Sequence, residues 1–230
     1  MLDSADDAGD LSRLEARLPL LLSMIAGMVD STGFFTLGHV FTAHVTGNIV
    51  LAAGVAVEGG SFHWAQLLTI PVFMLALATV SMIAQASQRH GPALARLLLL
   101  VQFLLLAALL IFSVVTKASA DPVGLLAGTA AMMAVSAMAC QYALLRLAVP
   151  GAISTAVMTG NLTNAALSAM DLLAARNPLL PYDSTPLNRS LQRLLGFVSG
   201  CVVAAAAAAV MADWTWFLPA ALSAVAIAMR

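Results

Sequence analysis

The chain has 230 residues, of which 61% are hydrophobic and only 9% charged, and its formal net charge is −1. Soluble domains carry roughly 25% charged residues, so this composition excludes an ordinary soluble protein and indicates a polytopic membrane protein whose first partner is the lipid bilayer. The small net charge and the scattered basic residues also exclude a nucleic-acid-binding protein.

Long apolar stretches follow a polar start along the chain. Residues 1–18 predict a disordered tail, and residues 19–230 predict a single transmembrane domain that is not preceded by a cleaved signal peptide. Most stretches approach the roughly 20 residues that cross a bilayer core, and the last is short, so the sequence predicts an all-α protein with six transmembrane helices. The stretches lie at about 19–38, 65–87, 94–116, 123–147, 191–212 and 214–229.

A Thr-Gly-Asn triplet occurs twice between these stretches. The copies are Thr46, Gly47, Asn48 and Thr159, Gly160, Asn161. Each opens a short apolar run, within residues 41–58 and 152–173, as a polar cap opens a helix. The first run spans only about 15 Å at 1.5 Å per residue, which favours half-helices over full spans, although short spans stay open.

The basic residues favour segments that enter and leave the membrane on one side. In that arrangement only Lys117, of ten Lys and Arg residues, lies opposite the others. If both segments crossed fully, Arg89, Arg96 and Arg146 would lie outside instead, and the count of basic residues inside and outside would change from 9:1 to 7:3. The positive-inside rule therefore predicts re-entrant half-helices, with the N- and C-termini in the cytoplasm.

Two half-helices divide the chain into two inverted repeats. Each half then has three crossings, and an odd number of crossings inserts the second half upside down. The first repeat covers residues 19–116, the linker 117–122 and the second repeat 123–229. Inverted repeats place a shared binding site near the membrane midplane.

The chemistry expected at such a site is that of two exposed helix N-termini. Their unpaired N–H groups and helix dipoles would suit a small polar or anionic solute, with Thr and Asn as caps. We expect both triplets to bind the solute, with His44, Ser154 and Asn164 as accessory residues. The alternative is that these small polar residues only pack transmembrane helices together.

Asp30 is a carboxylate about a dozen residues into the first span. An unpaired charge there costs roughly 2.5–3.5 kcal/mol, so we expect a coupling or gating role that uses H+ or Na+. A structural anchor between helices is the alternative. Gln141 lies 18 residues before Thr159, much as Asp30 lies 16 before Thr46, and we include it among the solute-binding residues.

No residue set suggests a metal site, a cofactor or catalysis. Cys140 and Cys201 both lie in apolar stretches, and no set of metal ligands or nucleophile with a base accompanies them. We therefore predict no metal, no cofactor and no enzymatic activity.

Residues 27–38, followed by residues 41–48, resemble the signature of the YoaK-like family of bacterial inner-membrane proteins. Residues 154–158, just before the second triplet, resemble that family's second half, so the likeness covers the chain from about residue 19. The resemblance implies a cytoplasmic-membrane location and a transport role, and it brings no established substrate.

The leading hypothesis is a secondary transporter or permease for a small polar or anionic solute. The alternatives are a passive channel with an aquaporin-like layout and a non-transporting membrane subunit that binds a protein partner. The sequence leaves the substrate, the coupling ion, the direction of transport and the oligomeric state open.

Overall fold

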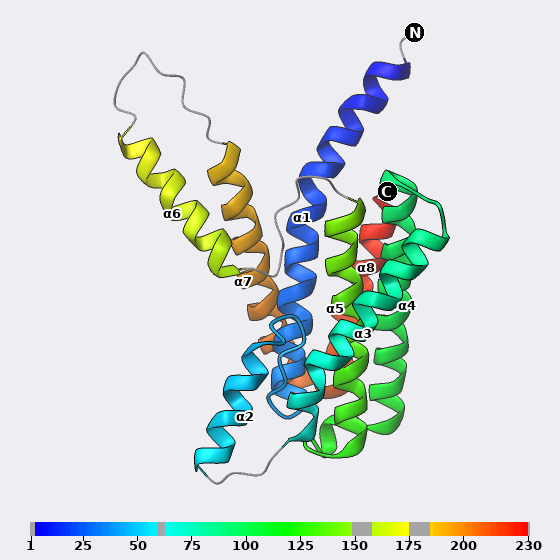
Figure 1. The fold of residues 1–230 in the computed structure, drawn as a ribbon, viewed down its shortest axis with the longest axis vertical. Coiled ribbons are helices and arrows are strands. Elements are labelled where there is room, and N and C mark those ends of the chain that lie inside the picture. The colour runs from blue at the N-terminus through cyan, green and yellow to red at the C-terminus, as the bar shows by residue number, and fades with distance from the viewer. Residues whose placement is uncertain (1–2, 59–62, 149–157, 175–184, 230) are drawn as a thin grey trace.

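The structure is a computed structural model that describes residues 3–58, 63–148, 158–174 and 185–229, with side chains from Leu18 onward (Figure 1). Throughout these ranges every regular element is a helix, which confirms the all-α prediction. The long helices are α1 (Asp3–Thr36), α3 (Trp64–Ala86), α4 (Gly91–Thr116), α5 (Leu125–Ala148) and α7 (Thr185–Met211), and the shorter ones are α2 (Gly47–Glu58), α6 (Met158–Ala174) and α8 (Phe217–Ala228).

Five stretches of the described chain are long and apolar enough to cross a membrane. Four are α1 from Leu18, α3, α4 and α5. The fifth has 44 residues and contains both α7 and α8, joined by the 3-10 turn η2 (Ala212–Trp216). This makes the chain a multi-pass membrane protein. Alone, α8 has 12 residues, or about 18 Å at 1.5 Å per residue, which is shorter than the bilayer core.

Helices α1 and α5 form the centre of the molecule. In the apolar part of each span, 61% of the residues of α1 and 67% of those of α5 are buried, against 17% to 33% for the other three spans. Helix α1 packs mainly against α7, and α5 packs against α3 and α4. Helix α8 packs against α4 and α1, while the two short helices each lie beside the helix that follows them, α2 beside α3 and α6 beside α7.

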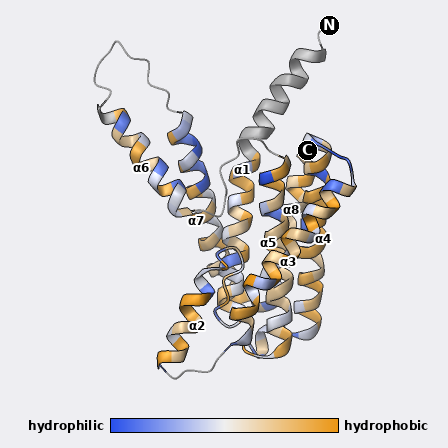
Figure 2. Ribbon diagram, in the orientation of Figure 1, coloured by the Kyte–Doolittle hydropathy of each residue, from blue (hydrophilic) through white to orange (hydrophobic). Residues whose placement is uncertain are grey.

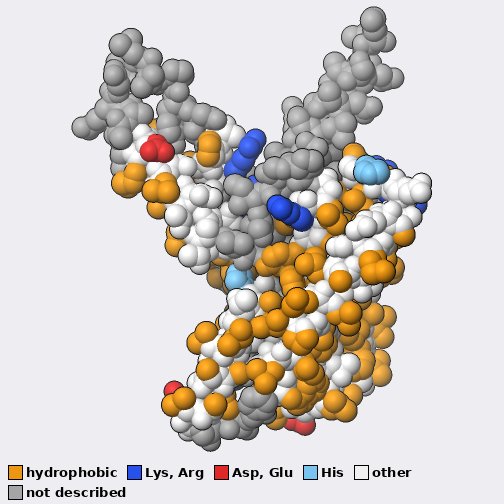
Figure 3. Space-filling view, in the orientation of Figure 1, with side chains coloured by type: hydrophobic (Ala, Val, Ile, Leu, Met, Phe, Trp, Pro, Cys, Tyr) orange, Lys and Arg blue, Asp and Glu red, His pale blue; other side chains and the backbone are white. Residues whose placement is uncertain are grey.

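The polar and apolar surfaces are arranged as a bilayer requires. Hydrophobic residues follow α2, α3 and α4 along most of their length (Figure 2). In space-filling view hydrophobic side chains cover the face over α2 and α3, and the Lys and Arg side chains visible there lie nearer the end from which α1 starts (Figure 3). The exposed large residues, such as Met74, Leu75 and Leu104, are those expected to contact lipid chains.

Glycines let α1 and α7 approach each other closely. A Cβ on Gly27 would meet the main chain at Phe197 and Cys201, and one on Gly200 would meet the main chain at Met24. A Cβ on Gly196 would lie 2.6 Å from the carbonyl oxygen of Leu20. The small residues at 196 and 200 therefore pack helices, as the Gly-x-x-x-Gly spacing predicts.

The segment between the two halves is attached to the second half. Lys117 ends α4 in a left-handed conformation, with φ +52°, and the short 3-10 helix η1 (Ala118–Ala120) follows. The Asp213 carboxylate, in η2, accepts bonds from the Ser119 N–H at 3.0 Å and the Ser119 hydroxyl at 2.8 Å. At the other end of the chain α1 begins at Asp3, so most of the segment expected to be a disordered tail is helical here.

Candidate functional site

The segment between α1 and α2 folds back onto Asp30. Asp30 lies on α1 and is only 5% exposed. Its Oδ1 accepts the backbone N–H groups of Thr42 at 2.7 Å and Ala43 at 2.9 Å. Hydrogen bonds from backbone N–H groups to a carboxylate are shorter and stronger than those between neutral groups. Asp30 therefore fixes the path of the chain just before the first triplet.

The second carboxylate oxygen of Asp30 binds His44. The distance from Oδ2 to Nδ1 of the imidazole is 2.7 Å, and the His44 side chain is 33% exposed. His44 lies outside the five long helices. The hydrogen bond from Asp30, helped by its negative charge, raises the pKa of the imidazole above its ordinary value of 6.5, against the opposing effect of burial. An acid and an imidazole are thus paired directly before the first triplet.

Asn48 holds the same segment from the other side. Its Oδ1 accepts the N–H of Phe41 at 2.8 Å, and its Nδ2 donates to the Phe41 carbonyl at 2.7 Å and to the Thr69 hydroxyl at 3.1 Å. Asn48 has no exposed surface. Both ends of its amide are therefore engaged in fixing the loop to α2 and α3.

The first N–H groups of α2 are paired with turn carbonyls, which corrects the expected capping. Gly47 N–H donates to the His44 carbonyl at 2.8 Å, Asn48 N–H to that of Val45 at 3.3 Å, and the next N–H to that of Thr46 at 3.2 Å. Such bonds, which run from the N–H of one residue to the carbonyl three residues before it, pair the first N–H groups of a helix without a side-chain cap. Helix α2 begins at the predicted triplet, but its first N–H groups are not left open for a solute.

One cavity is lined by the starts of both Thr-Gly-Asn copies. Its volume is about 330 Å³. The first copy contributes the residues up to Thr46, and the second contributes Thr159 with the residue before it. The remaining wall comes from α3 and α5. The lining residues are Ala43, His44, Val45, Thr46, Phe73, Tyr142, Met158 and Thr159.

The two triplets have the same pattern of exposure. In each, the Thr is exposed, the Gly is half-buried and the Asn has no exposed surface. Of the six triplet residues, the two threonines line the shared cavity. Gly47 is the first residue of α2, where a Cβ would lie 3.1 Å from the Phe41 ring. Gly160 and Asn161 lie in the first turn of α6.

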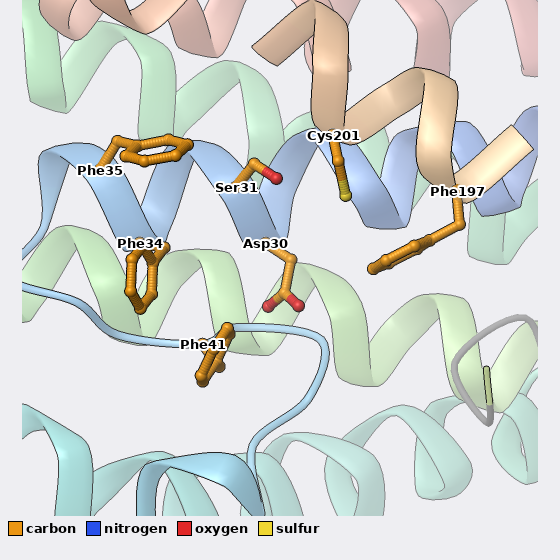
Figure 4. Close-up of a pocket in the computed structure, with 7 residues that line it drawn as sticks. All are labelled: Asp30, Ser31, Phe34, Phe35, Phe41, Phe197 and Cys201. Atoms are coloured by element: carbon orange, nitrogen blue, oxygen red, sulfur yellow. The ribbon is translucent and has the colours of Figure 1, made fainter. Parts of the chain in front are cut away.

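A second, mostly apolar cavity lies on the other side of the Asp30 carboxylate. Its volume is about 230 Å³. In Figure 4 the carboxylate of Asp30 points toward Phe41, with Phe197 and Cys201 reaching in from α7. The His44 ring contacts the Phe197 ring, with centroids 5.2 Å apart. The full lining is Asp30, Ser31, Phe34, Phe35, Phe41, Phe197 and Cys201.

Two of the predicted residues, Gln141 and Asn164, do not line the shared cavity. Gln141 is buried on α5, where its Nε2 donates to the Leu22 carbonyl at 2.9 Å and its Oε1 accepts from Gln102 at 2.8 Å. It therefore joins α5 to α1 and α4 and does not line the shared cavity. Asn164 is exposed on α6. Ser154 lies outside the described residues.

Sequence reasoning missed two polar residues of this region. The Tyr142 hydroxyl donates to the Ala43 carbonyl at 2.9 Å, and its ring lines the shared cavity beside Phe73. A phenol in an apolar span of a chain with two tyrosines was the signal for it. Arg193, one turn before Phe197 on α7, is 4% exposed, and its Nε and Nη1 have no partner in the described part of the chain.

The described residues contain no cluster of side chains suited to binding a metal ion. No group of three or more His, Cys, Asp or Glu residues lies close enough there to hold a metal ion. The predicted absence of a metal and of a cofactor stays a prediction.

Comparison with known proteins gives a family without an assigned activity. The family described as "Protein of unknown function (DUF1275)" matches residues 18–229. The UPF0700 transmembrane protein YoaK of Bacillus subtilis (strain 168) is 30% identical over 203 residues, which cover 86% of this chain and 84% of that protein. No solved structure matches. These findings confirm the resemblance to the YoaK-like membrane family.

Proposed function

We propose that this chain, which belongs to the DUF1275 family of membrane proteins, is a secondary transporter for a small polar or anionic solute. The observation that carries the proposal is the cavity of about 330 Å³ lined by the starts of both Thr-Gly-Asn segments. In transporters built from repeats, the substrate site lies where interrupted helices from the two halves meet.

The packing of the helices supports two inverted repeats. If α1 to α4 correspond to α5 to α8 in order, the contact of α1 with α7 has its equivalent in the contact of α5 with α3. Likewise, the contact of α4 with α5 has its equivalent in the contact of α8 with α1. The contact of α2 with α3 has its equivalent in the contact of α6 with α7. Every main packing pair thus has an equivalent, as a pseudo-two-fold axis requires.

The two short helices support a re-entrant arrangement. Helix α2 starts near the middle of the molecule and runs toward one end, whereas α6 starts near the middle and runs toward the opposite end (Figure 1). With 12 and 17 residues, they are about 18 and 26 Å long at 1.5 Å per residue, less than a bilayer core of about 30 Å. Six crossings complete this proposed topology, the sixth being α8 together with the 3-10 turn η2 that directly precedes it.

Charge supports an orientation in the cytoplasmic membrane. The start of α1 and the end of α8 lie at the same end of the molecule, together with the end of α3 and the start of α4 (Figure 1). Arg89, Arg96 and Arg146 belong to that end, whereas Lys117 follows α4 at the other. Under the positive-inside rule, the arginine-rich end, and with it both termini, is cytoplasmic.

The lining of the shared cavity supports a polar solute of modest size. Thr46 and Thr159 offer hydroxyl groups from the two copies, His44 offers an imidazole, and Phe73 and Met158 form apolar walls. Among the described residues that line this cavity there is no carboxylate, since Asp30 lines the other cavity and binds N–H groups and His44.

Reconstitution tests the proposal. Purified protein in liposomes is assayed for uptake of radiolabelled monocarboxylates, inorganic anions, amino acids and neutral polyols. Saturable, counterflow-stimulated uptake of one class, reduced in a Thr46→Val, Thr159→Val double variant, is the expected result. Non-saturating flux without counterflow would indicate a passive channel instead. The absence of flux for every class would contradict both, and would favour a subunit that binds a protein partner.

A further inference from the structure

The Asp30 and His44 pair lies between the two cavities. Asp30 lines the smaller, apolar cavity, and His44 lines the cavity shared by the two triplets. The His44 ring also touches Phe197, which belongs to the smaller cavity. Of the described residues, this bonded pair is therefore the polar link from one cavity to the other.

The surroundings of Asp30 do not suit a sodium ion. Sodium sites in transporters use carbonyl and carboxylate oxygens that point at the ion. Here Oδ1 receives the N–H groups of Thr42 and Ala43, and Oδ2 receives the imidazole nitrogen. The nearby Ala43 carbonyl is bound by the Tyr142 hydroxyl. Hydrogen-bond donors occupy both oxygens, and donors repel a metal cation.

The same surroundings suit a proton. With Nδ1–H donating to the carboxylate, the neutral His44 ring keeps Nε2 as a proton acceptor, and the described residues provide no hydrogen bond to that nitrogen. A proton from cavity water that binds Nε2 converts a pair of charge −1 into a neutral imidazolium–carboxylate pair. Release of the Nε2 proton to water reverses the step. Because the protonated pair has no net charge, burying it in a membrane protein costs less free energy than burying the unprotonated pair.

Other titratable groups face the pair from two neighbouring helices. The groups of α3 and α6 that line the shared cavity do not titrate, and residues 149–157 contain no titratable side chain by sequence. The titratable groups around the pair are Tyr142 on α5 and Cys201 on α7, each of which interacts electrostatically with Asp30.

We propose that Asp30 and His44 form a proton-binding site open to the shared cavity, with His44 Nε2 as the atom that takes up and releases the proton. Resting on the transport function proposed above, this assigns H+ rather than Na+ as the coupling ion. Asp30 acts as a positioning residue, because it holds the ring and its tautomer through Nδ1.

Titration of His44 tests the site without any knowledge of the solute. The full chain is labelled with ¹⁵N-histidine in nanodiscs, and its four histidines are followed from pH 5 to 9, with His44→Gln to assign the signal. We expect His44 to titrate in this range, and Asp30→Asn to lower its proton affinity about tenfold or more, since a charge-assisted bond is lost. Replacing K+ by Na+ should leave the titration unchanged.

A matched control is His39→Gln. His39 contacts Phe34 with ring centroids 4.8 Å apart and lines neither cavity, so its loss should leave the His44 titration in place. If Asp30→Asn does not fold, a second measurement takes its place, in which proton uptake is compared between the wild type and His44→Gln in unbuffered solution. The wild type should bind one more proton than His44→Gln between pH 5 and 8. A His44 ring that stays neutral down to pH 5, or a shift of its titration by Na+ but not K+, overturns the proposal.

A second readout separates this proposal from the proposed transport function. Liposomes that contain a pH-sensitive dye report internal acidification when a transported solute enters. Acidification in the wild type, with solute flux but no acidification in His44→Gln, supports the assignment of H+. Saturable solute flux without acidification in the wild type overturns it. If no solute moves while His44 titrates as expected, the proton site holds and the transport function fails.

Discussion

The two Thr-Gly-Asn segments have the same triplet and the same exposure pattern, yet different surroundings. The first is fixed by a network from three helices, in which Asp30, Asn48 and Tyr142 all bind the loop that leads into α2. The second, in α6, packs mainly against α7, and several polar side chains on it are exposed. The triplet thus accounts for what the copies share at the cavity, while long-range contacts from α1, α2 and α5 fix the loop of the first copy and give it a titratable group.

The substitution with the largest expected effect on this contrast removes the carboxylate of Asp30. Asp30→Ala leaves two buried N–H groups and His44 without their acceptor, so we expect a loss of about 3–5 kcal/mol in the free energy of unfolding. Gln141→Ala, at the corresponding position in the second half, should cost about 1–2 kcal/mol, because neutral hydrogen bonds are lost. Denaturant titration in mixed micelles measures both, and equal losses would remove the asymmetry.

Asn48 provides the next test. Asn48→Ala deletes both bonds to the Phe41 backbone in a buried setting, and we expect a loss of about 2–3 kcal/mol. Asn164→Ala, on the exposed side of α6, should change stability by less than about 0.5 kcal/mol. The same unfolding assay compares them. A loss for Asn164→Ala as large as that for Asn48→Ala would mean that the second copy is as firmly fixed as the first.

The two cavity-lining threonines test what the copies share. Thr46→Val and Thr159→Val each remove one hydroxyl while preserving shape, and both residues are exposed in the triplet pattern. We expect each to raise the KM for the transported solute about 2- to 10-fold, with stability unchanged, because one hydrogen bond contributes about 0.5–1.5 kcal/mol. An effect from one threonine alone would show that the solute contacts a single copy.

The smallest expected effect is a dependence of stability on pH that only the first copy produces. The pKa of His44 is raised in the folded protein, so its bond to Asp30 stabilises the fold fully below the ordinary pKa of about 6.5. That contribution is lost as pH rises through the folded-state pKa. Melting temperatures in nanodiscs from pH 5 to 9 should therefore decline less in His44→Gln than in the wild type. Identical profiles would contradict this linkage.

Composition predicted the spans well because a bilayer imposes length and hydropathy on each helix separately. The triplet at residues 46–48 likewise predicted where α2 begins. The partners of its side chains could not be predicted, because the Asn48 amide binds Phe41, seven residues back, and Thr69 on another helix. Such contacts depend on how the loop folds over α1, and local spacing does not contain that information.

Gln141 shows a second limit. Counting residues back from the triplet selected Gln141, but successive residues of a helix point about 100° apart. Gln141 faces α1 and α4, so its neighbour Tyr142 is the one that reaches the loop and the cavity. Spacing located the right turn of α5, and only the orientation of α5 against α1, α3 and α4 could select the residue.

The close crossing of α1 and α7 has a mechanical consequence. Gly27, Gly196 and Gly200 bring main chain against main chain, so little side-chain layer remains there to be compressed or sheared. The crossing joins the helix that carries Asp30 to the one that carries Phe197. Two rods in contact at their backbones turn about that point far more easily than they separate. If the proposed transport moves α7 against α1, this crossing is the expected pivot, and the largest displacements should occur far from it, at the outer ends of α6 and α2.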